Sequence, residues 1–211
     1  SEPFEFYARF VDFKNMTVIP KLELPGGGDI PILGLGTWFI GEVASEFDRE
    51  VNAVRYAMDR GIQLIDTAEM YANGRAEEVV GAAIKGFGPD RRDDVFIVSK
   101  VLPSNASYQG AIAACNSSLH RLGTEYIDLY LLHWPGSVPF QETLDALLAL
   151  RSAGKIRHFG VSNFDAEKMF EWLGLNGGRE SATNQILYNL SRRGVEWNVI
   201  PLCRNYDLPI M

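Results

Sequence analysis

Short apolar runs alternate along this chain with longer segments in which apolar residues recur every three or four positions. The runs that we expect to be strands cover residues 33–36, 62–66, 95–99, 127–132, 156–161 and 182–188. The segments that predict helices lie near residues 46–60, 76–87, 108–122, 140–151, 166–173 and 195–205. Near-continuous apolar strands that alternate with amphipathic helices indicate a parallel sheet covered by helices.

The chain before the first of these strands has a different pattern. Two apolar segments flank the glycine-rich stretch Pro25-Gly-Gly-Gly-Asp29 and predict a β-hairpin between residues 17 and 35. Residues 1–16 are rich in aromatic side chains and have no clear period, so we expect an N-terminal extension followed by one domain at residues 17–211. Residues 208–211 have the character of the beginning of a seventh strand.

The strand ends follow one another at nearly even intervals. If Thr37, Asp66, Lys100, His133 and Asn163 are taken as the ends, consecutive ends are 29, 34, 33 and 30 residues apart. So regular a period favours a (β/α)8 TIM barrel over an open doubly wound sheet, and a barrel has its active site at the carboxyl ends of its strands. The chain supplies about six βα units and the start of strand seven, which predicts an incomplete barrel.

Side chains that can transfer protons follow three of these strands. Asp66, Lys100 and His133 each end an apolar run, and Tyr71 lies five residues beyond Asp66. A carboxylate at a buried strand end is costly without a cation, so Lys100 is its natural partner, although a purely structural ion pair would also satisfy both groups. A cation beside Tyr71 would lower the pKa of its phenol from about 10 and make it a useful general acid. His133 could then hydrogen-bond a substrate carbonyl.

Other residues at the strand ends predict the walls of a pocket. Trp38 and Trp134 each follow a strand end, where aromatic side chains commonly line an apolar pocket, although packing beneath a loop is almost as common a role. Ser162, Asn163 and Gln185 could bind a planar amide through paired hydrogen bonds. Serine and asparagine are also frequent in turns, so turn formation remains an alternative for the first two.

Composition argues against several other classes of protein. Asp and Glu number 27 against 20 Lys and Arg, a net charge of −7, which disfavours nucleic acid or an anionic membrane as a partner. No apolar run approaches the roughly 20 residues that cross a bilayer, and no secretory signal is visible, so we expect a cytoplasmic protein. Cys115 and Cys203 lack metal-ligand spacing and the three histidines are dispersed, so no metal site is predicted.

Six stretches of the sequence resemble the aldo-keto reductases. In order they are Leu-Gly-Leu-Gly-Thr-Trp (33–38), Ile-Asp-Thr-Ala-Glu-Met-Tyr (65–71), Ile-Val-Ser-Lys (97–100), Asp-Leu-Tyr-Leu-Leu-His-Trp (128–134), Gly-Lys-Ile-Arg-His-Phe-Gly-Val-Ser-Asn-Phe (154–164) and Thr-Asn-Gln (183–185). The resemblance extends from about Thr17 to the last residue. It is strongest to bacterial reductases that act on methylglyoxal and similar small aldehydes.

That resemblance implies reduction of small aldehydes and ketones to alcohols with NADPH and without a metal. Tyr71 would be the proton donor, Lys100 would lower its pKa, Asp66 would hold Lys100, and His133 would orient the carbonyl. The resemblance implies that the cofactor contacts Gly36, Thr37, Asp66, Ser162, Asn163 and Gln185. Ser162, Asn163 and Gln185 would hold its carboxamide.

The family's barrel continues beyond the point at which this sequence stops, with strands seven and eight and a basic loop for the adenosine phosphates. We therefore expect a fragment or truncated gene product that is unstable, or associates through exposed barrel edges, and binds the cofactor weakly. Two other functions remain open. One is a Schiff-base aldolase with Lys100 as its nucleophile, and the other is an inactive or regulatory relative that keeps the fold for binding.

Overall fold

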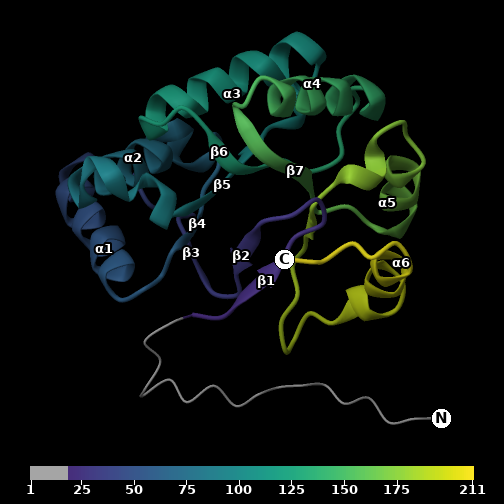
Figure 1. The fold of residues 1–211 in the computed structure, drawn as a ribbon, viewed down its shortest axis with the longest axis horizontal. Helices are drawn as coiled ribbons and strands as arrows, with labels where there is room; N and C mark the ends of the chain where they lie inside the picture. Colours follow the sequence, from purple (N-terminus) through teal and green to yellow (C-terminus); the bar gives the residue numbers. More distant parts are fainter. Residues whose placement is uncertain (1–18) are drawn as a thin grey trace.

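The computed structural model describes residues 19–211, apart from the side chains of residues 87, 89 and 90, so the predictions for residues 1–16 lie outside the described part. Six parallel strands form one sheet in sequential order, with each strand hydrogen-bonded to the next. They are β3 Gly34–Gly36, β4 Leu64–Asp66, β5 Phe96–Val101, β6 Ile127–Leu132, β7 Ile156–Ser162 and β8 Asn184–Gln185. The sheet curves into an arc with helices around its outside (Figure 1).

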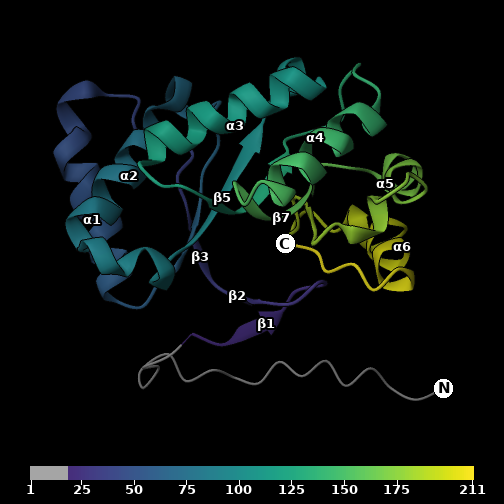
Figure 2. The same cartoon turned by 45° about the horizontal axis from the view of Figure 1, so that its top comes forward.

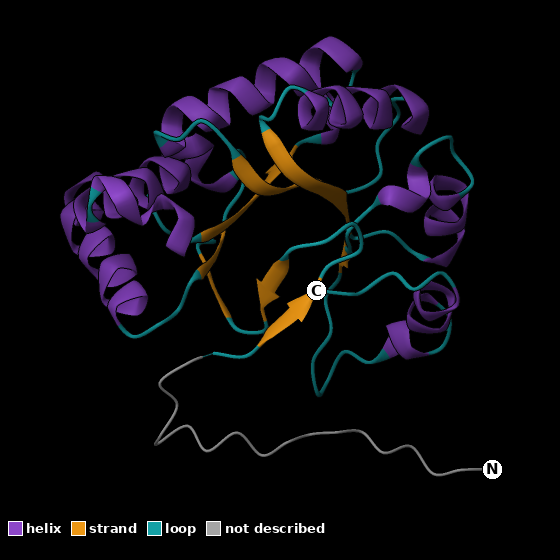
Figure 3. Cartoon of the chain, viewed as in Figure 1, coloured by secondary structure: helices purple, strands orange, loops and turns teal. Residues whose placement is uncertain are grey.

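A helix follows each strand of the sheet, which gives the alternation that the sequence predicted. The helices are α1 Phe47–Asp59, α2 Arg75–Phe87, α3 Tyr108–Leu122, α4 Phe140–Ser152, α5 Ala166–Leu173 and α6 Val199–Asn205. Figure 3 shows the strands as an inner arc and the helices as an outer one. The predicted fold, an incomplete (β/α)8 barrel, is confirmed.

Capping side chains explain why two helix starts were predictable. Ser107 precedes α3 and its hydroxyl accepts a hydrogen bond from the Gly110 amide at 3.2 Å. Asp165 precedes α5 and its carboxylate accepts one from the Lys168 amide at 2.8 Å. These bonds satisfy amides that have no acceptor inside the helix, so both helices begin directly after the cap.

Alternation along the strands divides the core into an outer and an inner layer. On β5, Ile97 and Val101 pack in the outer layer between the sheet and the helices. Val98 faces the other way and packs in the inner layer with Leu129 and with Leu24 of the N-terminal hairpin. The interior of the barrel is therefore filled by side chains.

The N-terminal hairpin pairs β1 Lys21–Glu23 with the antiparallel strand β2 Asp29–Pro31. It lies across one end of the sheet (Figure 2). A side chain at Gly28 would lie 3.3 Å from Nε2 of His158, near the start of β7, so the hairpin covers the amino ends of the strands. The carboxyl ends are left for a site.

Two elements near the end of the chain are shorter than predicted. The strand expected at residues 182–188 is limited to β8, because its partner β7 ends at Ser162, which pairs with Gln185. The helix expected at residues 195–205 begins only at Val199, after a separate 3-10 turn at Gly194–Glu196. Pro201 has no amide hydrogen and is tolerated only in a first helical turn, so the helix cannot begin much earlier.

The start of a seventh strand is present, as predicted. Ile210 forms a parallel bridge with Asn184, and the Met211 amide donates to the Asn184 carbonyl at 3.2 Å. Among the helices that the structure describes, none combines the length and apolar character needed to cross a bilayer.

Candidate active site

Three predicted residues lie side by side at the carboxyl ends of neighbouring strands. Asp66 ends β4, Lys100 is the penultimate residue of β5, and His133 follows β6 directly. Lys100 is on the same face of β5 as Val98 and therefore points into the barrel, whereas Ser99 faces the helices. Strand pairing and alternation together bring these side chains to one rim.

The ammonium of Lys100 is the centre of the site. This side chain is 1% exposed. Its Nζ donates to both carboxylate oxygens of Asp66 at 2.9 Å and to the Thr67 carbonyl at 2.8 Å. It also donates to the phenol oxygen of Tyr71 at 3.2 Å. The positive charge is therefore buried, paired and in direct contact with the tyrosine hydroxyl.

Tyr71 lies at the start of a strained turn that positions its side chain in this site. It is 9% exposed and begins a 3-10 segment, Tyr71–Gly74. Ala72, Asn73 and Gly74 have φ values of 48°, 55° and 89°, all in the left-handed region. Such a conformation is costly for residues other than glycine and persists where the surrounding structure imposes it.

His133 is neutral in this environment. Its burial, and then the positive charge of Lys100, lower the pKa of His133 to about 4. Nδ1 is buried and has no hydrogen-bond partner among the described residues. The ring packs edge-on against Tyr71 with centroids 5.7 Å apart. A neutral imidazole can donate one hydrogen bond to a substrate oxygen.

Aromatic side chains surround the phenol. Trp38 is 63% exposed and lies nearly parallel to Tyr71, with ring centroids 6.4 Å apart. Trp134 lies against His133, with centroids 4.6 Å apart. Phe39, which sequence reasoning missed, stacks on Trp38 at 4.8 Å and has a φ of 71°. These rings form an apolar rim beside the polar centre.

The residues implied to contact a cofactor divide into two groups. Gly36 is exposed, with no atom within 4 Å of the place where a side chain would begin, and Asn163 is also exposed, although its Nδ2 donates to the His133 carbonyl at 3.0 Å. Gln185 donates from Nε2 to Asp66 at 2.9 Å. In contrast, the buried Thr37 and Ser162 donate their hydroxyls to main-chain carbonyls at 3.0 Å, so both support the rim.

A pocket of about 480 Å³ adjoins this rim between the two edge strands of the sheet, β3 and β8, and the N-terminal hairpin. Its walls include Gly36 and Asp66 on one side and Gln185 and Met211 on the other, with the hairpin residue Leu24 among the rest. Open space thus lies directly beside the charged centre.

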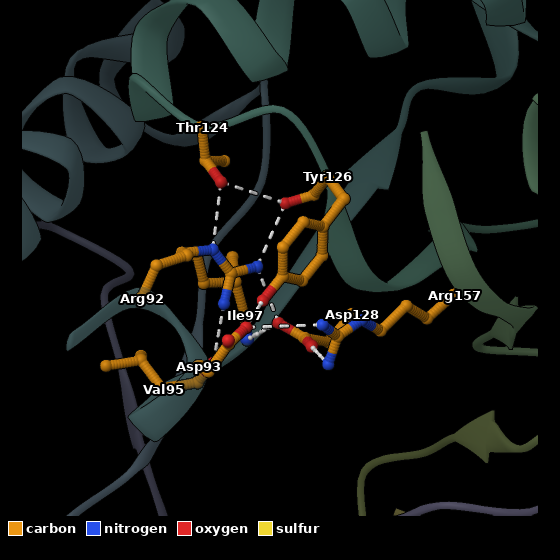
Figure 4. Close-up of polar contacts among 8 residues, drawn as sticks. All are labelled: Arg92, Asp93, Val95, Ile97, Thr124, Tyr126, Asp128 and Arg157. Atoms are coloured by element: carbon orange, nitrogen blue, oxygen red, sulfur yellow. Dashed lines mark hydrogen bonds and ion pairs between the residues drawn. The ribbon is translucent and has the colours of Figure 1, made fainter. Parts of the chain in front are cut away.

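A second charged network, which no sequence pattern predicted, lies at the opposite end of the strands. Asp128, at the start of β6, accepts hydrogen bonds from Arg92 at 2.7 Å and Arg157 at 3.3 Å. Both guanidinium groups lie over the ring of Tyr126, whose hydroxyl donates to Asp93 at 2.5 Å (Figure 4). We call these residues the amino-end cluster.

Neither a metal cluster nor a reactive thiol accompanies the site. Within residues 19–211, no three His, Cys, Asp or Glu side chains gather in a way that could hold a metal ion. Cys115 and Cys203 are buried and free in α3 and α6. Burial raises the pKa of Cys115 to about 12, so it packs as a small protonated side chain.

This chain belongs to the aldo/keto reductase family, whose sequence model matches residues 32–211. It is 50% identical over 190 residues to methylglyoxal reductase YeaE of Escherichia coli, which covers 90% of this chain and 66% of that protein. It is 39% identical to aldo-keto reductase YhdN of Bacillus subtilis, covering 82% of this chain and 54% of that protein. The chain therefore spans between about half and two thirds of the length of these relatives.

A solved structure has the same fold and contains a nicotinamide cofactor. The aldo/keto reductase of Klebsiella pneumoniae, in complex with NADP and acetate, matches with a TM-score of 0.85 at 47% identity. The match covers 92% of this chain and 67% of that one.

Proposed function

We propose that this chain reduces small aldehydes and ketones to alcohols with NADPH, and that Tyr71 is the proton donor. The observation that carries the proposal is the contact of the buried Lys100 ammonium with both Asp66 and the Tyr71 hydroxyl. The ring of Tyr71 packs with Ala68 and Ala76, and this packing does not by itself require a hydroxyl at the ion pair.

The hydrogen-bond direction at Tyr71 suits proton donation. Its oxygen accepts from Lys100, so its own proton is free to pass to a substrate oxygen. The adjacent positive charge stabilises the negative charge that remains on the phenolate. Asp66 holds the ammonium in place through two contacts of 2.9 Å.

The remaining residues orient the substrate. His133 is uncharged at neutral pH, because its pKa is lowered to about 4, and can donate a hydrogen bond to the carbonyl oxygen. The rings of Trp38 and Trp134 provide apolar walls that exclude water from the reacting carbonyl. With a net charge of −7, a small carbonyl compound suits this chain better than nucleic acid or an anionic membrane.

The rim also has features that fit a nicotinamide cofactor. The missing side chain at Gly36 leaves open space, and the side-chain oxygens of Asn163 and Gln185 can accept hydrogen bonds from a carboxamide, while their amide nitrogens donate to His133 and Asp66. NADPH, when bound, supplies the hydride for the carbonyl carbon. The NADP complex of the Klebsiella relative supports this cofactor, and the name of the E. coli relative supports methylglyoxal as the first substrate to test.

An aldolase is a weaker candidate for this site. A nucleophilic lysine must be uncharged, yet Nζ of Lys100 donates to Asp66, to the Thr67 carbonyl and to Tyr71. These contacts stabilise the ammonium. Borohydride trapping with methylglyoxal checks this point, and we expect no adduct on Lys100.

The decisive experiment compares two tyrosine variants in the oxidation of NADPH by methylglyoxal. Tyr71→Phe should lower kcat by about 10²- to 10⁴-fold, because it removes the proton donor. Tyr126→Phe, which removes a hydroxyl from the amino-end cluster, should have the kcat of the wild type. Absence of turnover in the wild type, or full turnover in Tyr71→Phe, would rule the proposal out.

A further inference from the structure

Glu77 is a fully buried carboxylate that the proposed reaction does not use. It lies in the first turn of α2 and is 0% exposed. A buried charge is costly unless both of its oxygens have partners. Oε1 accepts a hydrogen bond from the Ser99 hydroxyl at 2.6 Å, and Oε2 accepts one from Nε of Arg121 at 2.6 Å.

The first of these contacts fixes the strand that carries the lysine. Ser99 precedes Lys100 on β5 and points from the opposite face of the strand toward α2. Its bond to Glu77 holds the carboxyl end of β5 against the helix. Any shift of Ser99 along or away from α2 moves the Lys100 side chain by a similar distance.

The second contact fixes the turn that carries the tyrosine. A side chain at Gly74 would lie 2.6 Å from Cδ and Nε of Arg121, so the arginine covers this residue directly. Gly74 ends the left-handed turn that begins after Tyr71. Glu77 therefore holds Arg121 against the strained turn as well as holding Ser99.

We propose that Glu77 is a positioning residue that keeps the phenol of Tyr71 within hydrogen-bond distance of Lys100, which is 3.2 Å in the structure. The carboxylate of Glu77 connects β5, which carries Lys100, with the turn that carries Tyr71. The expected effect on rate rests on the proposed function, whereas the effect on the geometry does not.

The test compares Glu77→Gln with Asp128→Asn. Glu77→Gln keeps the size of the side chain but removes the negative charge, so the guanidinium of Arg121 loses its buried ion-pair partner and the Ser99 hydroxyl loses its charged acceptor. Asp128 is a matched control because it is 2% exposed and bound by two arginines, but lies in the amino-end cluster. Both variants should unfold at lower denaturant concentration than the wild type.

The kinetic readout separates positioning from a general loss of stability. Per folded molecule, Glu77→Gln should lower kcat by about 10- to 100-fold, because displacement of catalytic groups by about 1 Å has effects of this size. The KM for methylglyoxal should change by less than about twofold, since proton transfer rather than binding is affected. Asp128→Asn should keep both values. Ser99→Ala, which removes one contact only, should lower kcat less than Glu77→Gln.

A second readout does not depend on activity. Lys100 is 1% exposed and should resist acetic anhydride in the wild type and in Asp128→Asn. It should become labelled in Glu77→Gln, as peptide masses would show. If the wild type lacks turnover, the proposed function fails and the labelling alone decides the role of Glu77. Unchanged labelling together with an unchanged kcat in Glu77→Gln would overturn the inference.

Discussion

Each end of the sheet contains an acid paired with a base, with Lys100 buried at one end and Asp128 at the other, yet the two ends differ in how completely their polar atoms are used. In the amino-end cluster, Asp128 accepts from Arg92, Arg157 and the Ile97 amide. At the carboxyl end, the buried Nδ1 of His133 has no partner among the described residues. Burial and pairing are common to both ends, so the unpaired Nδ1 of His133 is the feature that distinguishes the candidate active site from the amino-end cluster.

The two tyrosines show the same contrast in the direction of a hydrogen bond. Tyr126 donates to Asp93, and its pKa is raised to about 12, chiefly by burial and then by that bond. It therefore keeps its proton at neutral pH. Tyr71 instead accepts from Lys100, which leaves its proton available. Positive charges lie near both tyrosines, so the direction of the bond at the hydroxyl is the contrast on which the proposed role of Tyr71 rests.

The largest expected effect separates the two ends by activity. Lys100→Met should lower kcat by about 10³-fold or more, because the phenolate loses its stabilising charge. Arg92→Met, its counterpart in the amino-end cluster, should leave kcat per folded molecule within about twofold of the wild type. NADPH oxidation with methylglyoxal measures both. Equal losses in the two variants would show that the ends do not differ in function.

Arg92→Met should also be less stable than the wild type. Arg92→Met leaves Asp128, which is 2% exposed, with a single arginine at 3.3 Å. We expect a loss of about 2–3 kcal/mol in the free energy of unfolding, near the lower limit for breaking a buried ion pair. Urea denaturation measures it. A loss below about 0.5 kcal/mol would mean that Arg157 compensates.

A smaller effect, on the free energy of unfolding, should appear only at acid pH and should come from His133. The pKa of His133 in the folded chain is about 4, below its ordinary value near 6.5. Between these values the unfolded chain binds a proton that the folded chain does not, so stability is full above about pH 6.5 and falls as the pH approaches about 4. The loss over this window is at most about 3 kcal/mol. His133→Asn should reduce the difference in unfolding free energy between pH 7 and pH 4.5.

His158 provides the matched control for that titration. Burial lowers the pKa of His158 as well, but the negative charge of Asp128 opposes the shift. His158→Asn should therefore change the acid sensitivity less than His133→Asn. The opposite order would contradict the assigned environments.

The smallest effect should come from the rim of the amino-end cluster. Tyr126→Phe removes the hydroxyl bond to Asp93, whose side chain is 79% exposed. Bonds to such solvated charges contribute little, so the melting temperature should equal that of the wild type within experimental error. A clear fall would show that the hydroxyl organises the two arginines.

Much of the site was predictable from sequence because barrel geometry converts spacing into position. Asp66, Lys100 and His133 end apolar strands at a regular period, and parallel pairing places such ends on one rim. Tyr71 followed from its closeness to Asp66 in the sequence. Its strained turn was not predicted: Asn73 and Gly74 are residue types that favour a left-handed backbone, but Ala72 is not.

The missed residues have interactions that no local pattern encodes. Glu77 stands in the first turn of a helix, where acidic residues are common and usually solvated, so nothing distinguished it from an exposed residue. Arg92 and Asp128 are 36 residues apart in the sequence. Their pairing depends on the direction of side chains at the strand starts, which the fold class alone does not fix.

The left-handed turn after Tyr71 has a consequence for protein engineering. Replacing Ala72 by glycine would relieve its steric cost, which is about 1–2 kcal/mol per residue in this conformation. The same change would loosen the segment that presents the phenol. Selection for a high melting temperature alone would thus favour glycine at position 72 at the expense of turnover. Measurements of melting temperature and kcat on Ala72→Gly would reveal this conflict.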